Sequence, residues 1–315
     1  MLSTSSCAQP SAVPDGLPDA PFGRVLTAMV TPFTADGSVD LDAAAALAAH
    51  LVQHGHDGLV VSGTTGESPT TSDEEKVALL RAVVDAVGDR AHVVAGVGSY
   101  DTRHSVHGAR AAAEAGATGL LVVTPYYSRP PQAGVLAHFR AVADATELPV
   151  MLYDIPGRTA TKISTETLLR AGEHPRIVAV KDAVGDVYAG TEVMAATDLA
   201  YYSGDDAANL AWLAHGASGL VSVVGHVAGD EYRAMVQAVL TGDLAAAQRI
   251  YRATLPAVRG IMTRTQGAIM AKAALQLQGV LASRAVRLPL VEATDEQVAL
   301  LRADLAEAAL IQAPA

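Results

Sequence analysis

Short apolar runs alternate with amphipathic segments from residue 24 to residue 223. Eight of these runs are rich in Val, Ile, Leu and Tyr and mostly follow Gly, Pro or Asp, which is typical of strands. Because the runs are continuous rather than alternating, they indicate strands that are covered on both faces. The predicted strands are 24–31, 58–62, 92–96, 119–124, 149–153, 177–181, 200–203 and 219–223.

The segments between these strands predict helices. In residues 72–87, Ser72 and Glu75 form a capping box, and Val77, Leu80 and Val84 then recur with helical period. Residues 101–115 and 131–145 show a similar pattern. Repeated strand-plus-helix units favour an α/β chain folded as a (β/α)8 TIM barrel over a doubly wound sheet.

Two regions flank the predicted barrel, which we assign to residues 21–228. Residues 1–20 are rich in Ser, Thr and Pro and lack the basic start and apolar segment of a signal peptide, so they predict a disordered tail. Residues 229–315 predict a C-terminal helical domain packed onto the barrel. Its expected helices are 229–240, 243–263, 266–278 and 295–311.

Composition narrows the class of protein. Hydrophobic residues make up 50% of the chain and charged residues 17%, which excludes a wholly disordered protein. The net charge of −11 argues against nucleic acid or an anionic membrane as a partner, and no apolar run is long enough to span a bilayer. Cys7, in the tail, is the only cysteine, so an intrachain disulfide is excluded. We therefore expect a cytoplasmic protein.

Reactive residues gather where the predicted strands end. Chemistry in a TIM barrel belongs at the C-terminal ends of the strands, so these segments are expected to meet at one mouth. The segments are Gly63-Thr64-Thr65-Gly66-Glu67-Ser68, Thr124-Pro125-Tyr126-Tyr127, Tyr153-Asp154-Ile155-Pro156-Gly157-Arg158-Thr159, Val180-Lys181-Asp182 and Ser203-Gly204-Asp205-Asp206.

Lys181 is the sharpest single indication of chemistry. Strand alternation places Ile177, Ala179 and Lys181 on one face. A lysine at the end of an apolar strand lies in a low dielectric, which lowers the pKa of its ammonium and leaves some neutral amine. A neutral amine can attack a ketone and form a Schiff base. The alternative is a structural lysine in an ion pair with a nearby carboxylate, for which the candidates are Asp154, Asp182 and Asp205.

Other residues at the same mouth suit such chemistry. The phenol of Tyr153, one strand earlier, could move protons near Lys181. Thr64 and Thr65 lie between glycines, so hydroxyl and backbone N–H groups can face a carboxylate. Arg158 offers a guanidinium fork for a second carboxylate. Taken singly, each also fits an ordinary rim tyrosine, turn or surface arginine.

Competing chemistries find less support in the sequence. His50 and His54 are four residues apart, but no HExxH motif and no pair of histidines at a strand end is present, so we predict no metal site. Gly96-Val97-Gly98 lacks the third glycine of a dinucleotide fingerprint, and neither a phosphate-binding loop nor a nucleophile elbow occurs.

Taken together, the strand-end segments resemble the pyruvate-dependent class I aldolase family. The resemblance covers roughly residues 23–310, and the motifs occur in family order. It implies a barrel with a C-terminal helical domain, assembled as a homotetramer of two tight dimers. It also implies a lyase that uses no cofactor, because a lysine itself forms the covalent Schiff base with pyruvate.

The resemblance assigns chemical roles residue by residue. Lys181 is similar to the Schiff-base lysine, and Tyr153 to the proton donor and acceptor. Thr64 and Tyr127 match the other members of a tyrosine–threonine–tyrosine proton relay. In the family, the residue equivalent to Tyr127 reaches into the neighbouring subunit's site.

The resemblance also implies the substrates. Thr65 and the backbone at Val221 match positions that bind pyruvate, and Arg158 resembles the arginine that receives the carboxylate of L-aspartate 4-semialdehyde. The implied reaction condenses these two compounds into a cyclic product, the first committed step of diaminopimelate and lysine biosynthesis. The alternatives are an N-acetylneuraminate lyase-like or keto-deoxy-sugar-acid aldolase of the same family, and a non-catalytic ligand-binding barrel.

Two departures from the family pattern bear on specificity and regulation. Residues 223–226 read Val-Val-Gly-His where many members have a Thr-Ala-Asn-like stretch. Feedback-inhibited members hold lysine with an asparagine and a glutamate, and Tyr100 and His104 stand at those positions, while Lys76 replaces a nearby histidine. We therefore expect lysine feedback to be weak or absent.

Overall fold

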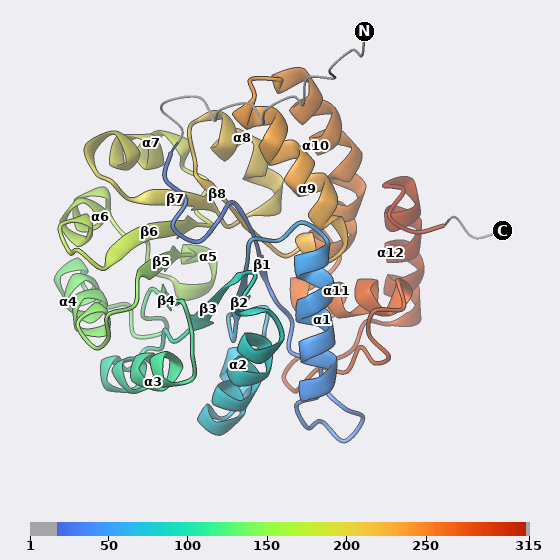
Figure 1. Cartoon of the computed structure of the whole chain (residues 1–315), viewed down its shortest axis with the longest axis horizontal. Helices are drawn as coiled ribbons and strands as arrows, with labels where there is room; N and C mark the ends of the chain where they lie inside the picture. The colour runs from blue at the N-terminus through green and yellow to red at the C-terminus, as the bar shows by residue number, and fades with distance from the viewer. Residues whose placement is uncertain (1–17, 313–315) are drawn as a thin grey trace, which may run out of the picture.

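Eight parallel strands close into a barrel in the computed structural model, which describes residues 18–312 (Figure 1). The prediction of a (β/α)8 barrel is confirmed, and each predicted strand is present within a few residues of its expected bounds. Most of the predicted disordered tail, including Cys7, lies outside the described residues. The strands are β1 Val25–Ala28, β2 Gly58–Val61, β3 His92–Gly96, β4 Gly119–Val123, β5 Val150–Asp154, β6 Ile177–Asp182, β7 Ala200–Ser203 and β8 Gly219–Ser222.

Helices surround the barrel and extend beyond it (Figure 1). The capping box predicted for α2 is present, since the Ser72 hydroxyl accepts from the Glu75 N–H and the Glu75 carboxylate accepts from the Ser72 N–H. None of the helices in the described part is long and apolar enough to cross a bilayer. The helices are α1 Leu41–Gln53, α2 Asp73–Val87, α3 Thr102–Glu114, α4 Gln132–Ala143, α5 Pro156–Thr159, α6 Thr165–Gly172, α7 Val187–Ala196, α8 Asn209–Ala214, α9 Gly225–Leu240, α10 Leu244–Val258, α11 Gly267–Leu277 and α12 Asp295–Glu307, with short turns η1 Ser68–Thr70 and η2 Asp206–Ala208 and a π-helix η3 Arg259–Thr263.

The interior of the barrel is a packed apolar core. Side chains from every strand fill it, among them Leu26, Val60, Met151 and Val221. Phe22 closes the N-terminal end of this core, where its ring makes an edge contact with Tyr202. Because the lower layers are filled, chemistry is expected toward the C-terminal ends of the strands.

The predicted alternation along β6 is wrong at its first residue. The strand register shifts between Val150 and Met151 of β5, so Met151 pairs with Ala179 rather than Val178. Ile177 consequently packs in the outer core with Val180, whereas Ala179 belongs to the inner core. From Ala179 onward the alternation holds, and Lys181 still faces the barrel interior.

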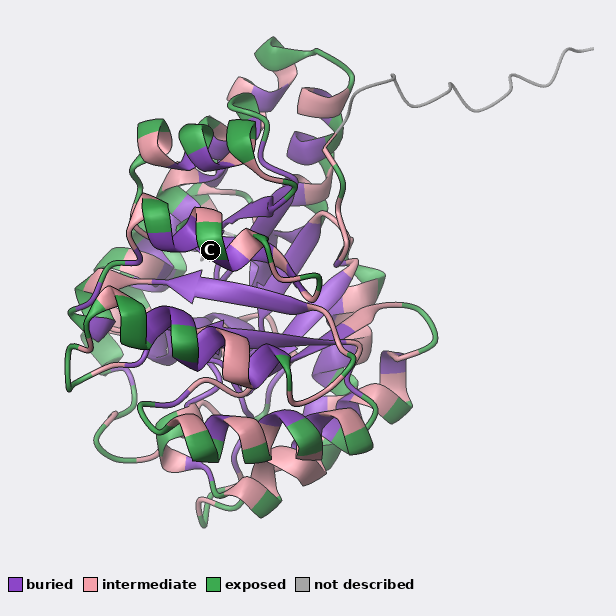
Figure 2. Ribbon diagram, turned by 90° about the vertical axis from the view of Figure 1, so that its left-hand side faces the viewer, coloured by how far each residue is buried: buried purple, intermediate pink, exposed green. Residues whose placement is uncertain are grey.

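The C-terminal helices share one apolar core with the outer face of the barrel. This core includes Val25 of β1, Met235 of α9, Met270 of α11 and Leu301 of α12. Figure 2 shows the buried strands and the banded burial of the helices around them. Helix α9 begins at Gly225, four residues earlier than predicted, but its backbone is non-helical at Ala228. The proposed domain boundary after residue 228 coincides with this kink, and the division into domains stays a prediction.

Candidate active site

Lys181 and Tyr153 lie side by side where β5 and β6 end. The two residues are paired in register on neighbouring strands. The Lys181 Nζ is 4.3 Å from the centroid of the Tyr153 ring. Both residues are buried. A Cβ at Gly204 would lie 3.0 Å or less from the Lys181 side chain, so glycine at this position leaves room for the lysine. The sequence therefore brings an amine and a phenol together at the barrel mouth.

The surroundings of Lys181 favour its neutral form. Burial, reinforced by the positive charge of Arg158, lowers the pKa of Lys181 to about 7, and the charge of Asp206 opposes this shift. Lys181 makes no ion pair within residues 18–312. The nearby carboxylates hydrogen-bond to backbone N–H groups instead: one oxygen of Asp154 accepts from Ile163, Asp182 from Val184 and Gly185, and Asp205 from Ala207. The other Asp154 oxygen has no partner among the described residues, and burial raises the pKa of this carboxyl to about 7. The alternative of a structural, ion-paired lysine finds no support in these contacts.

Tyr153 keeps its proton at neutral pH. Burial raises the pKa of its phenol to about 12, although the charge of Arg158 acts in the opposite direction. The Tyr153 carbonyl accepts hydrogen bonds from both the N–H and the hydroxyl of Thr124, which fixes the end of β5. When the neutral amine attacks a carbonyl carbon, the protonated phenol beside it can donate a proton to the alkoxide that results.

The loop after β2 brings Thr64 to the same place. Thr64 and Tyr153 both line a cavity of about 60 Å³ at the ends of β2 to β5. The loop is closed by hydrogen bonds from the Glu67 N–H to the Thr64 carbonyl and from the Thr31 hydroxyl to the Gly66 carbonyl. Thr65 is buried next to Thr64. Two hydroxyls are thus held near the barrel mouth by a turn with its own hydrogen bonds.

Arg158 and Tyr127 lie further out. Arg158 belongs to α5, which begins directly after β5, and its side chain is exposed. In the described part of the chain its guanidinium makes no hydrogen bond or ion pair, which leaves it available for an anion. Tyr127 is 91% exposed and has a left-handed φ of 72°, so a single chain does not bring it to Lys181. Its neighbour Tyr126 lines the cavity instead and packs edge-on against Tyr100.

Val221 of β8 lies in the inner core, and Asp206 holds the turn that follows this strand. Asp206 is buried, and its carboxylate accepts from the hydroxyl of Ser222 and from the N–H groups of Val223 and Val224. The position of Asp206 at the end of β7 was visible in the sequence, but its partners follow a different strand.

The departure at residues 223–226 has a structural role. His226 is buried, its Nε2 accepts from the Val30 N–H at 3.0 Å, and its Nδ1–H donates to the Val223 carbonyl at 2.7 Å. Burial lowers the pKa of His226 to about 4, so the ring is neutral and suits both bonds. The imidazole ties the start of α9 to the loop after β1. Among the described residues, no group of three or more His, Cys, Asp or Glu side chains could hold a metal ion.

Comparisons with known proteins identify the family of this chain. Residues 21–308 match the Dihydrodipicolinate synthetase family. The chain belongs to this family. It is 69% identical to the 4-hydroxy-tetrahydrodipicolinate synthase of Kineococcus radiotolerans over 94% of this chain and 96% of the relative.

Solved structures of the family have the same fold. The lysine-bound DHDPS of Cyanidioschyzon merolae superposes with a TM-score of 0.90 at 41% identity, over 93% of this chain and 100% of the other. The chloride-inhibited dihydrodipicolinate synthase of Acinetobacter baumannii, complexed with pyruvate, gives a TM-score of 0.88 at 33% identity, again over 93% and 100%.

Burial is expected to set the pH at which Lys181 reacts, and the charge of Arg158 is expected to shift it further. Because the pKa of Lys181 is lowered to about 7, the rate of imine formation with a small keto acid should rise with pH through that value and then level. Arg158→Gln removes a positive charge that disfavours the ammonium, so its profile should move to higher pH. Arg158→Lys keeps the charge and is the matched control. The pH profile is measured as the rate of adduct capture by borohydride from pH 5.5 to 9. Coincident profiles for wild type and Arg158→Gln would show that the charge of Arg158 does not lower the pKa of Lys181.

Proposed function

We propose that this chain is a 4-hydroxy-tetrahydrodipicolinate synthase, a class I aldolase-type lyase that condenses pyruvate with L-aspartate 4-semialdehyde. The observation that carries the proposal is the buried amine of Lys181, with its lowered pKa and no carboxylate partner in the described residues, against the phenol of Tyr153. The names of the relatives favour this reaction over cleavage of a sugar acid. A non-catalytic barrel would have no need to keep this amine unpaired.

The reaction begins at Lys181. Its neutral amine attacks the ketone carbon of pyruvate, Tyr153 protonates the forming alkoxide, and loss of water gives the protonated Schiff base. Thr65 and the backbone at Val221 hold the pyruvate carboxylate. Loss of a methyl proton then converts the Schiff base into an enamine, and the iminium nitrogen takes up the electron pair.

The enamine is the nucleophile of the second half-reaction. Its carbon attacks the aldehyde carbon of L-aspartate 4-semialdehyde, while Arg158 holds that substrate's carboxylate. The new alkoxide is protonated through the relay of Tyr153, Thr64 and Tyr127. The amino group of the product then displaces the Lys181 amine by transimination, which closes the ring and returns the lysine to its free form. No cofactor enters these steps.

Tyr127 makes the relay depend on assembly. In one chain its ring is almost fully exposed, although its backbone is held in a left-handed conformation that a non-glycine residue rarely adopts. We propose that Tyr127 enters the site of a neighbouring copy in a tight dimer, two of which form a tetramer. We place the enzyme in the cytoplasm, where it would supply lysine biosynthesis.

Covalent capture tests the proposed function directly. Borohydride is expected to trap pyruvate on Lys181, and Lys181→Ala is expected to lose the adduct while it keeps the fold, because a residue at the barrel mouth contributes little to the core. Mass spectrometry locates the adduct, and a coupled assay with L-aspartate 4-semialdehyde measures ring formation. An adduct on Lys76, Lys162 or Lys272 would overturn the assignment.

Replacement of Arg158 by Lys is expected to affect only the second substrate. Lysine keeps the charge but loses the planar fork that pairs with a carboxylate. We expect kcat/KM for L-aspartate 4-semialdehyde to fall about ten- to a hundredfold, the equivalent of about 1.5–3 kcal/mol for a charge-assisted pair. Pyruvate trapping should stay near the wild-type rate. An equal loss for both substrates would show that Arg158 supports the whole site.

Lysine is expected to inhibit the enzyme weakly or not at all. A cavity of about 910 Å³ lies beside α2 and α3, and Asp73 and Glu74 line it together with Tyr100 and His104. An ammonium ligand needs a free acidic partner. The Asp73 carboxylate is already 2.8 Å from the His104 Nε2, and the Glu74 carboxylate accepts from the Ser72 hydroxyl. Steady-state rates across millimolar lysine test this, and strong inhibition would mean that one of these acids releases its partner for the ligand.

A further inference from the structure

A buried ion pair connects the loop that carries Thr64 and Thr65 to the C-terminal helices. Glu67 is 2% exposed and Lys272 is 0% exposed, and the Glu67 Oε1 is 2.5 Å from the Lys272 Nζ. Glu67 ends the loop after β2, whereas Lys272 belongs to α11 of the C-terminal helices. The proposed chemistry uses neither side chain. The presence of a charge pair in the protein interior therefore calls for a role other than direct participation in the reaction.

Lys272 is held by three groups at once. Its ammonium donates to the Glu67 carboxylate and to the Ala285 carbonyl at 2.7 Å, and it lies 4.1 Å from the centroid of the Phe33 ring. A buried ammonium costs several kcal/mol unless it is paired and hydrogen-bonded in this way. The lysine thus fixes the Glu67 carboxylate at one point relative to α11.

The backbone of Glu67 connects its fixed side chain to the rest of the loop. Glu67 has a left-handed φ of 55°, which a residue with a Cβ adopts only when its surroundings hold it there. In this conformation its N–H donates to the Thr64 carbonyl at 3.1 Å, and the Ser68 N–H donates to the Gly63 carbonyl at 3.3 Å. The turn that contains Thr64 and Thr65 is therefore closed at the residue whose side chain Lys272 holds.

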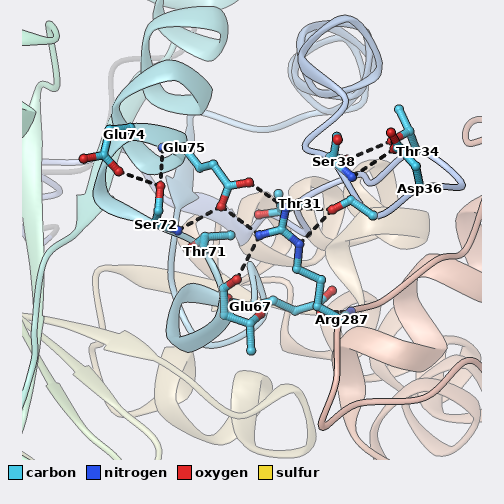
Figure 3. A network of polar contacts seen from close by, with 12 residues as sticks. Thr31, Thr34, Asp36, Ser38, Glu67, Thr71, Ser72, Glu74, Glu75 and Arg287 are labelled. Atoms are coloured by element: carbon cyan, nitrogen blue, oxygen red, sulfur yellow. Dashed lines mark hydrogen bonds and ion pairs between the residues drawn. The ribbon is translucent and has the colours of Figure 1, made fainter.

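Arg287 extends the anchor to α2. Its backbone N–H donates to the other oxygen of the Glu67 carboxylate at 2.9 Å. Its guanidinium binds both oxygens of Glu75, at 2.7 and 2.6 Å, and the carbonyls of Gly37 and Thr70 (Figure 3). The loop is thereby tied to α2, to the segment before α1 and to the chain that follows α11.

We propose that Glu67 is a positioning residue, and that its ion pair with Lys272 of the C-terminal helices holds the loop at residues 63–68 so that Thr64 and Thr65 meet pyruvate. The proposal rests on the proposed function, because it requires those two hydroxyls to act on the substrate. It gives the C-terminal helices a part in catalysis, although they contribute no side chain to the reacting atoms.

A positioning role and a purely stabilising role predict different effects on the kinetics of the two substrates. Thr65 holds the pyruvate carboxylate and Thr64 belongs to the proton relay, so both affect pyruvate binding or kcat. Arg158, which holds L-aspartate 4-semialdehyde, lies on α5 and makes no hydrogen bond to this loop. A displaced loop should therefore lower kcat and the use of pyruvate and leave KM for L-aspartate 4-semialdehyde near its wild-type value. A general loss of stability would affect both substrates alike.

Three variants test the proposal against a matched control. Glu67→Gln keeps the shape of the side chain and an acceptor for the Arg287 N–H, but it removes the charge. Lys272→Met removes the partner and leaves a buried unpaired carboxylate, and the double variant leaves no unpaired charge. Asp304→Asn is the control, because Asp304 of α12 is also a buried carboxylate, paired with Arg259 of η3 and with Arg264, which follows η3.

Kinetics and thermal unfolding together give the readout. For Glu67→Gln and for the double variant we expect kcat/KM for pyruvate to fall about tenfold or more, the size of effect that small displacements of positioning groups produce. The double variant should recover thermal stability relative to Lys272→Met without recovering the use of pyruvate. Asp304→Asn should lower the unfolding temperature and keep wild-type kinetics. Wild-type use of pyruvate in Glu67→Gln or in the double variant, or losses that track the unfolding temperature in all variants, would overturn the proposal.

A measurement on the wild type keeps the proposal testable if the variants fail to fold. Amide hydrogen exchange at Glu67 and Ser68 should be slow without substrate, because the anchored turn is closed before pyruvate binds. Exchange at these amides as fast as in exposed loops would contradict the anchor. If wild-type protein forms no borohydride-stable adduct with pyruvate, the proposed function fails instead, and this result is separate from any outcome for Glu67.

Discussion

The cost of burying an unpaired charge determines the design of the barrel mouth. An ammonium at the position of Lys181 would need a carboxylate partner, and the strand ends beside it are rich in aspartates. These acids hydrogen-bond to loops instead: Asp154, through one oxygen, and Asp182 accept from N–H groups of the loops that follow β5 and β6, and Asp206 accepts from the turn after β8. The same bonds that shape the loops thus keep the acids from Lys181. The lysine is left with a lowered pKa and a nucleophilic form at neutral pH.

Much of this arrangement could be predicted from local sequence signals. Strand runs and turn residues gave the eight strands because a covered parallel strand is apolar along its whole length. The capping box at Ser72 and Glu75 placed the start of α2 for a similarly local reason. The start of α9 and the alternation at Ile177 were predicted incorrectly. A kink at Ala228 and a register shift against β5 caused these errors, and both depend on neighbouring elements that no short window of sequence contains.

Some residues of the candidate site could likewise be predicted from sequence, and others could not. Lys181 and Tyr153 follow from alternation and strand order, because neighbouring parallel strands end at one edge. The roles of Asp206 and Glu67 could not be predicted, because each depends on hydrogen-bond partners that are distant in the sequence and close only in the folded chain. Glu67 and Lys272 are 205 residues apart in the chain. Tyr127 is a third case: its role came from the family resemblance, its ring is exposed in one chain, and we propose that a neighbouring copy covers it.

The buried pair of Glu67 and Lys272 also bears on why the barrel carries extra helices. A TIM barrel places its reactive groups on loops, and loops are the least constrained part of the fold. The helices around a barrel pack against its strands and do little to fix the loops at the mouth. Helix α11 approaches one such loop from behind and fixes it through a single charged contact, reinforced by Arg287. Hydrophobic contact alone would cover this loop without setting its position, because it is non-directional, whereas an ion pair with fixed hydrogen bonds selects one geometry. A catalytic loop with little apolar surface of its own is therefore a place where a buried charge pair can provide more precision than stability.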